Sequence, residues 1–127
     1  MRFDHAGIAT DDATALAALF SDLFDAEVVH EEEFDGMAVV FLDLGNGYFE
    51  LLEPLAGGTI ADYLDRHGPG IHHLAVETDD AAAALETARD LGIEPIDDEP
   101  RPGAWGHTVA FLHPRDTGGV LLEFVEH

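Results

Sequence analysis

The sequence repeats itself, and the repeat limits the folds that the chain can adopt. Residues 5–12 read HAGIATDD and residues 73–80 read HLAVETDD. Two further matches follow in the same order, GMAVVFL at 36–42 with GHTVAFL at 106–112, and FELLE at 49–53 with LEFVE at 122–126. The offset between equivalent residues of the two copies grows slightly along the chain, which places small insertions in the loops. The pattern indicates two copies of one supersecondary unit that share a core.

Each copy predicts one strand, one helix and three further strands. The apolar first strands, at about 2–9 and 71–78, end at Thr10 and Thr78, which we interpret as helix N-caps because Asp-Asp and an Ala/Leu-rich stretch follow. The expected helices are 11–24 and 80–91, and the remaining strands are 26–32, 37–44, 48–53, 93–97, 107–112 and 120–126. We therefore expect an α+β fold of two tandem βαβββ modules in one domain, with module one at about 1–54, a linker with a short helix at about 55–70, and module two at about 71–127.

Four ionisable side chains stand in these apolar strands at positions that the repeat makes equivalent. His5 matches His73, and Glu50 matches Glu123. The neighbours on both faces of each strand are mostly apolar, so a carboxylate there needs a partner or a metal ion. Two equivalent modules would bring two imidazoles and two carboxylates together, a donor set suited to cobalt, manganese, nickel, iron or zinc. The sequence therefore predicts a metal site formed by His5, Glu50, His73 and Glu123.

The other histidines carry weaker signals. His72 points away from His73 in the strand pattern, and we interpret it as structural. His107 and His113 flank the last hairpin and are candidates for the metal cavity. Three further histidines have no partner in the repeat and are interpreted as surface residues: His30, His67 and His127.

Several segments resemble the methylmalonyl-CoA epimerase family of the vicinal oxygen chelate superfamily. They are DHAGIA at 4–9, LGN at 44–46, ELLEPL at 50–55, GIHHLA at 70–75, DEPR at 98–101, FLHP at 111–114 and TGGVLLE at 117–123. The resemblance covers essentially the whole chain and implies a vicinal oxygen chelate fold with a metal cavity between the two sheets. The metal ligands of that family fall on the same quartet, and cobalt or manganese is the favoured ion, with nickel or zinc as alternatives.

The activity that this resemblance implies is epimerisation of (2R)- and (2S)-methylmalonyl-CoA through a metal-chelated enolate. Glu123 is the expected base, and Glu50 is the symmetric candidate for the opposite face, with His113 or a water as alternatives. Some members carry a further acid on the strand before the Glu50 position, and we align that acid with Val39, so this role does not transfer. Arg101, His107 and His113 are candidate substrate-binding residues, and Arg66, Arg101 or Arg115 could contact the CoA phosphates.

Other activities fit the same pattern less well. Glyoxalase I, which isomerises a hemithioacetal, has the same fold and four-ligand logic, but the FLHP and TGGVLLE segments favour the epimerase. A metal-free binding module of the antibiotic-resistance type typically lacks the full quartet. An extradiol dioxygenase needs two histidines and one carboxylate around iron, which leaves one glutamate unexplained.

The charge balance limits the partners and suggests the setting. The chain has 127 residues, with 27 Asp and Glu, five Arg and no Lys, for a net charge of −22. Such self-repulsion is tolerable when salt near 1 M shortens the Debye length to roughly 3 Å, so we hypothesise a high-salt cytoplasm. Nucleic acid and anionic membranes are unfavourable partners, and a CoA thioester is the expected one. No disulfide or thiolate metal site is available without cysteine, no secretory signal is recognisable, and a homodimer is expected.

Overall fold

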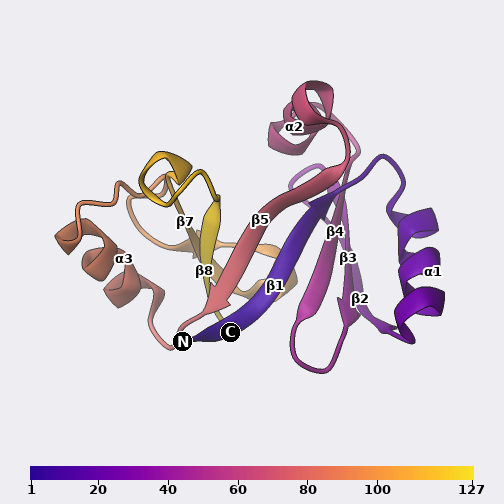
Figure 1. Cartoon of the computed structure of the whole chain (residues 1–127), viewed down its shortest axis with the longest axis horizontal. Coiled ribbons are helices and arrows are strands. Elements are labelled where there is room, and N and C mark those ends of the chain that lie inside the picture. The colour runs from indigo at the N-terminus through magenta and orange to yellow at the C-terminus, as the bar shows by residue number, and fades with distance from the viewer. The chain divides into compact units, whose positions relative to one another are not determined.

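The computed structural model describes residues 1–127 and contains two compact units, His5–His72 and Met1–Asp4 together with His73–His127 (Figure 1). Both copies of the repeat run in the order strand, helix, three strands. The elements of the first copy are β1 (Arg2–Ala9), α1 (Ala13–Phe24), β2 (Glu27–Phe34), β3 (Met37–Asp43) and β4 (Tyr48–Pro54), followed by α2 (Thr59–His67). Those of the second are β5 (Gly70–Glu77), α3 (Ala81–Asp90), β6 (Arg101–Pro102), β7 (Thr108–Leu112) and β8 (Leu122–Glu126), with 3₁₀ turns at Ala104–Gly106 and Pro114–Asp116.

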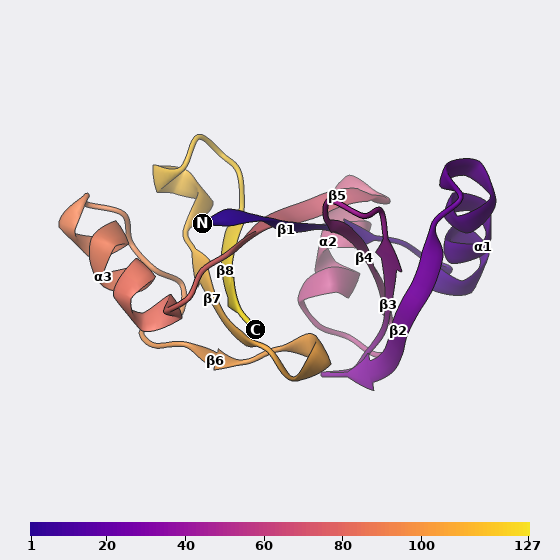
Figure 2. The same cartoon turned by 90° about the horizontal axis from the view of Figure 1, so that it is seen from below.

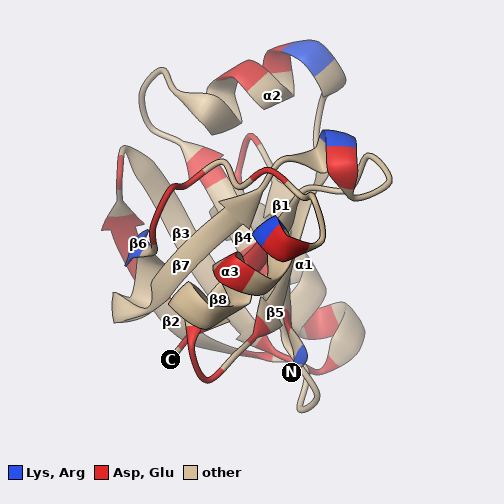
Figure 3. Ribbon diagram, turned by 90° about the vertical axis from the view of Figure 1, so that its left-hand side faces the viewer, with Lys and Arg blue, Asp and Glu red and all other residues tan.

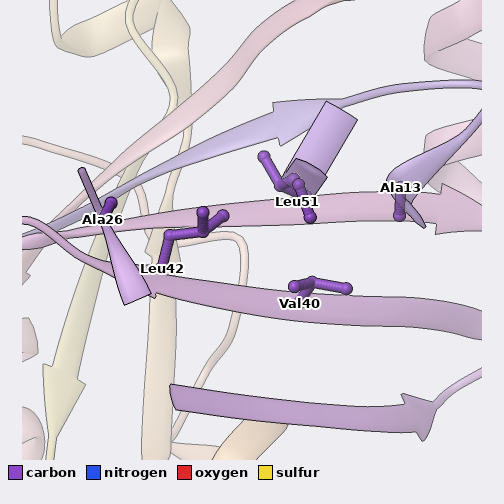
Figure 4. Close-up of a cluster of buried hydrophobic side chains, with 6 residues drawn as sticks. Ala13, Ala26, Val40, Leu42 and Leu51 are labelled. Atoms are coloured by element: carbon purple, nitrogen blue, oxygen red, sulfur yellow. The ribbon is translucent and has the colours of Figure 1, made fainter. Parts of the chain in front are cut away.

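In the first copy the strands lie in the order β2-β3-β4-β1, and β1 runs parallel to β4 while the other pairs are antiparallel. Helix α1 packs on β3 and β4. Figure 4 shows the buried cluster between them, with Ala13 at the start of α1, Ala26 just after its end, and three larger residues on the strands: Val40, Leu42 and Leu51. Because strand side chains alternate, this cluster fixes one face of the sheet toward α1 and leaves the other face for the site.

The second copy follows the same plan, with the order β5-β8-β7-β6 and β5 parallel to β8. Helix α3 packs on β7 and β8 (Figure 2) over a core that includes Leu85, Ala110 and Leu112. The two copies therefore cover the same face of their strands with a helix. This agrees with the strand–helix–three-strand parsing of the repeat.

The predicted strand at 93–97 is wrong. The segment forms only an isolated bridge between Pro95 and Leu112, and the strand that pairs with β7 is the two-residue β6. Pro95 has no N–H group, and its neighbour Ile96 donates to the carbonyl of Phe111 at 2.9 Å. The ladder then stops because the Asp97 side chain, not its backbone, accepts the Phe111 N–H at 2.8 Å.

The predicted helix caps at Thr10 and Thr78 are also wrong. The N-caps are Asp12 and Asp80, whose side chains accept the N–H groups of Ala15 and Ala83 at 3.0 Å. The threonine hydroxyls instead accept the N–H groups of Asp12 and Asp80. Each threonine thus shapes the turn that delivers the capping aspartate two residues later.

Acidic residues are spread over the molecule. Figure 3 shows red segments on helices, strands and loops, with blue at only a few positions. Several arginines are paired with acids, including Arg89 with Glu86 and Arg115 with Glu94. None of the helices has the length and apolar character needed to cross a bilayer.

Candidate metal centre

The first half of the predicted quartet forms a buried pair. His5 lies on β1 and Glu50 on β4, and both side chains are over nine-tenths buried. In the parallel ladder, Gly7 stands opposite Glu50, so no side chain separates the carboxylate from the imidazole two residues earlier on β1. The His5 Nε2 and Glu50 Oε1 atoms are 3.3 Å apart.

The second half repeats this arrangement. His73 on β5 and Glu123 on β8 are buried to the same degree, and the small Ala75 stands opposite Glu123. The distance from His73 Nε2 to Glu123 Oε1 is 3.5 Å. The two copies therefore present the same donor atoms, one imidazole nitrogen and one carboxylate oxygen, from equivalent strands.

An aromatic ring supports each imidazole. Phe41 stands opposite Glu50 in the β3–β4 ladder, and its ring meets that of His5 edge-on, with centroids 5.7 Å apart. Phe111 stands opposite Glu123, and its ring meets His73 in the same way at 5.3 Å. Edge-on aromatic contacts restrict ring rotation, so each imidazole is held by packing as well as by its strand.

Within each pair, the distance between the imidazole nitrogen and the carboxylate oxygen fits two ligands of one metal ion. Nitrogen and oxygen ligands bind first-row metals at about 2.0–2.2 Å, so two ligands at neighbouring coordination positions are roughly 3.0–3.5 Å apart. The observed distances of 3.3 and 3.5 Å lie in this range and exceed the usual N–H···O length. A buried carboxylate among apolar side chains also needs positive charge nearby. The donor set of each half is therefore suited to a divalent cation.

A second glutamate in each copy has a role that the sequence reasoning missed. Glu53 accepts the N–H of Ala13 at 2.8 Å, and Glu126 accepts the N–H of Ala81 at 2.9 Å. Each follows a predicted ligand by three residues on a strand, so it points to the opposite, helix-covered face. The repeated E-x-x-E spacing was the signal for this division between a site carboxylate and a helix cap.

His30 is not a simple surface residue, contrary to our interpretation. A bulge between Val28 and His30 shifts the β2–β3 register, so that His30 pairs with Phe41 and lies on the site face. Its ring is 6.2 Å from the Phe41 ring, and its Nε2 is 3.4 Å from an Oε of Glu32. Val39 is nearly fully buried, and its partner across the ladder is Glu32. Glu32 therefore places a carboxylate on the site face of the first copy, beside Val39, whose side chain has none.

Arg101 occupies the corresponding position in the second copy. It pairs with Val109 in the β6–β7 ladder, and its guanidinium carbon lies 5.6 Å from the Phe111 ring centroid. Asp97 accepts its Nε–H at 2.9 Å, while the other Asp97 oxygen accepts the Phe111 N–H. Arg101 is thus fixed on the face that bears His73, and nearly half of its side chain is exposed.

The two histidines near the last hairpin lie in different surroundings. His113 begins a 3₁₀ turn, and its Nδ1 accepts the N–H of Arg115 at 3.2 Å. This leaves its Nε2 as the proton-bearing nitrogen when the ring is neutral. The His107 ring stacks on Trp105 and on His127, with centroids 5.6 and 4.0 Å apart.

Comparison with known proteins agrees with this geometry. The family model of the glyoxalase/bleomycin resistance protein/dioxygenase superfamily matches residues 4–111. Human mitochondrial methylmalonyl-CoA epimerase is 37% identical over 126 residues, covering 96% of this chain and 72% of that protein. The ethylmalonyl-CoA/methylmalonyl-CoA epimerase of Cereibacter sphaeroides is 39% identical over 127 residues, covering 96% of this chain and 95% of its own.

The chain belongs to the methylmalonyl-CoA epimerase family. A solved structure of a variant of the Streptomyces coelicolor methylmalonyl-CoA epimerase, in complex with 2-nitronate-propionyl-CoA, matches 99% of this chain and 96% of its own with a TM-score of 0.92 and 36% identity. The recognised family, the α+β vicinal oxygen chelate fold and the assignment to the epimerases are therefore confirmed.

Proposed function

We propose that this epimerase interconverts (2R)- and (2S)-methylmalonyl-CoA by moving the proton at C2. The observation that carries the proposal is the repeated pair of buried His and Glu side chains, each with the spacing of two metal ligands. The identity with named epimerases over 96% of the chain supports this substrate.

The proposed cofactor is one divalent cation, cobalt or manganese in preference to nickel or zinc. Its ligands would be His5, Glu50, His73 and Glu123, a mixed nitrogen and oxygen set typical of such ions. When bound, the ion supplies electrostatic stabilisation for the negative charge that develops on the thioester oxygen. The edge-on contacts of Phe41 and Phe111 hold the two imidazoles in position for this role.

Proton transfer is assigned to the two glutamates. Glu123 takes the C2 proton, the electron pair of the C–H bond moves into the thioester carbonyl, and the enolate forms. Glu50, its equivalent in the repeat, enters the step protonated, delivers that proton to the opposite face of the planar carbon and so inverts it. Exchange with solvent then returns Glu123 to the carboxylate and Glu50 to the acid. A carboxylate must be within hydrogen-bond reach of the proton it takes, and the burial of both side chains keeps water from competing.

Substrate binding is assigned to Arg101, with smaller roles for His107 and His113. Arg101 already has its Nε engaged by Asp97, which leaves the outer N–H groups of the guanidinium for an anionic part of the thioester. The oriented guanidinium favours CoA binding to a chain with a charge of −22, because few other cations offset the repulsion of CoA. His113 could donate from Nε2, since its Nδ1 accepts a backbone N–H.

The proposal extends to the cellular compartment and to the oligomeric state. The acidic surface supports function in the cytoplasm of a cell with high internal salt, where screening reduces repulsion within the protein and between the protein and CoA. We also propose a homodimer, which sedimentation in 1 M KCl would test.

The direct test follows one stereoisomer of methylmalonyl-CoA in D₂O with the metal-loaded protein in high salt. Mass spectrometry reports deuterium at C2, and a stereospecific mutase reports the other isomer. Starting from the isomer whose C2 proton Glu123 takes, we expect both deuterium and the second isomer with the wild-type protein, and neither with Glu123→Gln. Metal-saturated protein that gives no exchange and no epimer would refute the proposal, and the same sample would then be assayed with a hemithioacetal.

A further inference from the structure

A second group of metal-binding side chains lies outside the proposed centre, within the unit that contains Met1–Asp4 and His73–His127. Asp4 is on β1, Glu77 is the last residue of β5, and His127 follows β8. In Figure 1 the N and C marks lie near each other, which agrees with the contact between Asp4 and His127. The His127 Nε2 is 2.6 Å from Asp4 Oδ1, and the Nδ1 is 3.8 Å from Glu77 Oε2.

Three ligands on one cation need one donor atom from each side chain, and only one of the two His127 ring nitrogens can serve, so the Nε2 and Nδ1 distances belong to alternative donor sets. One donor atom from each of the three side chains lies within 4.8 Å of the other two. Ligands about 2.1 Å from an ion are roughly 3.0–3.4 Å apart at neighbouring positions and about 4.2 Å apart at opposite ones. The 2.6 Å contact is a hydrogen bond in this structure, and a small rotation of either side chain would open it to the ligand spacing.

The group is also held in place. Asp4 is 5% exposed, so its carboxylate cannot turn freely into solvent. The His127 ring lies on the His107 ring at 4.0 Å and 15°, and His107 stacks in turn on Trp105. Arg2 approaches the other oxygen of Glu77, with its Nε 3.7 Å from Oε1, and leaves Oε2 directed at His127. Such fixed donors lose little entropy when they bind an ion.

We propose that Asp4, Glu77 and His127 form a second site for a divalent transition-metal ion. One imidazole nitrogen and two carboxylate oxygens are a donor set for Zn²⁺, Co²⁺, Ni²⁺ or Cu²⁺, and waters would complete the coordination. The two carboxylates outweigh the single exposed Arg2 nearby, so the site attracts cations. It shares no ligand with the proposed catalytic centre, and it would link the strands β1, β5 and β8.

Zn²⁺ titration of metal-free protein tests this site. Calorimetry is done in 1 M KCl, which screens diffuse binding to the acidic surface. We expect two stoichiometric steps for the wild-type chain. His127→Ala should remove one step and keep epimerase activity, and Glu77→Gln should weaken the same step at least tenfold. Glu31→Gln and His67→Ala, which change an exposed acid and a histidine outside this group, are the matched controls. Asp4 is left intact because it adjoins His5.

A measurement on the wild-type protein makes the test independent of folding defects. Cu²⁺ is paramagnetic and belongs to the proposed set of ions, and in small amounts it broadens nuclear resonances close to it, so the ring signals of His127 and His107 should broaden while that of His67 persists. Two unchanged Zn²⁺ steps in His127→Ala, or an unaffected His127 ring with Cu²⁺, would overturn the proposal and leave a hydrogen-bonded contact between Asp4 and His127. Loss of the other step alone, in Glu123→Gln, would bear on the catalytic centre and not on this site.

Discussion

The two copies of the repeat present the same pair of donor side chains, but the residues beside the two pairs carry opposite charges. Each copy places His and Glu on neighbouring parallel strands with a phenylalanine against the imidazole. Val39 and Val109 are equivalent in the repeat, yet the residue across the ladder is Glu32 in the first copy and Arg101 in the second. Glu32 is paired with His30, and Arg101 with Asp97.

This difference has a chemical reason under the proposed function. A metal ion accepts equivalent ligands from two equivalent modules, but a malonyl thioester has a carboxylate on one side and a thioester on the other. Specificity for such a molecule requires unlike groups on the walls of the site. On the proposed function, duplication would account for the ligands, and the residues that break the repeat would account for the recognition of an unsymmetrical substrate.

The largest expected effect separates the two glutamates. Glu123→Gln and Glu50→Gln should each reduce epimer formation roughly 10³-fold, since a positioned acid or base contributes about 10²–10⁴. With the isomer whose proton Glu123 takes, Glu50→Gln should still incorporate deuterium without inversion, whereas Glu123→Gln should do neither. Equal loss of exchange in both variants, at unchanged metal content, would show that the two carboxylates do not act on opposite faces of C2.

Arg101 should give the next largest effect. Arg101→Gln is expected to raise KM about 10- to 100-fold with little change in kcat, because a hydrogen bond to a charged group contributes about 1.5–3 kcal/mol. Arg89→Gln is the matched control, since Arg89 is bound to Glu86 on α3 and has no place in the site. Steady-state kinetics at 1 M KCl measures both. An unchanged KM for Arg101→Gln would show that Arg101 does not bind the anionic part of the thioester.

The aromatic supports should matter equally in the two copies. Phe41→Leu and Phe111→Leu each remove an edge-on contact to a proposed ligand, at ring distances of 5.7 and 5.3 Å. We expect metal affinity to fall about tenfold in each, as is usual for residues that orient ligands. Competition with a chelator measures the affinity. A large loss in one variant only would mean that the two half-sites are not equivalent in metal binding.

Much of the architecture was readable from the repeat, and the exceptions have local causes. The repeat selected the quartet because His5/His73 and Glu50/Glu123 recur at matching positions. It could not reveal His30, since the bulge after Val28 turns that side chain to the site face and no simple alternation predicts it. The strand expected at 93–97 failed because the Asp97 side chain replaces a backbone acceptor. Both misses lie in the segment that follows the helix, where the two copies differ: β2 in the first, and the loop before β6 in the second.

The smallest effect concerns the helix-facing glutamates, Glu53 and Glu126, where the copies should again agree. Each accepts the first N–H of a helix, so Glu→Ala should lower the free energy of unfolding by about 1 kcal/mol or somewhat more. Glu→Gln keeps an acceptor oxygen and should cost only about 0.5 kcal/mol, the part due to charge at the helix N-terminus. Chemical denaturation in 1 M KCl measures these differences.

Activity and metal content are the control for that comparison. Alternation along β4 and β8 places these two carboxylates on the face opposite Glu50 and Glu123, so both properties should survive in every folded variant. If Glu126→Gln lost metal while Glu53→Gln did not, the faces of β8 would be misassigned. Agreement of the two copies would show that the duplicated E-x-x-E segment separates catalysis from helix capping by strand geometry alone.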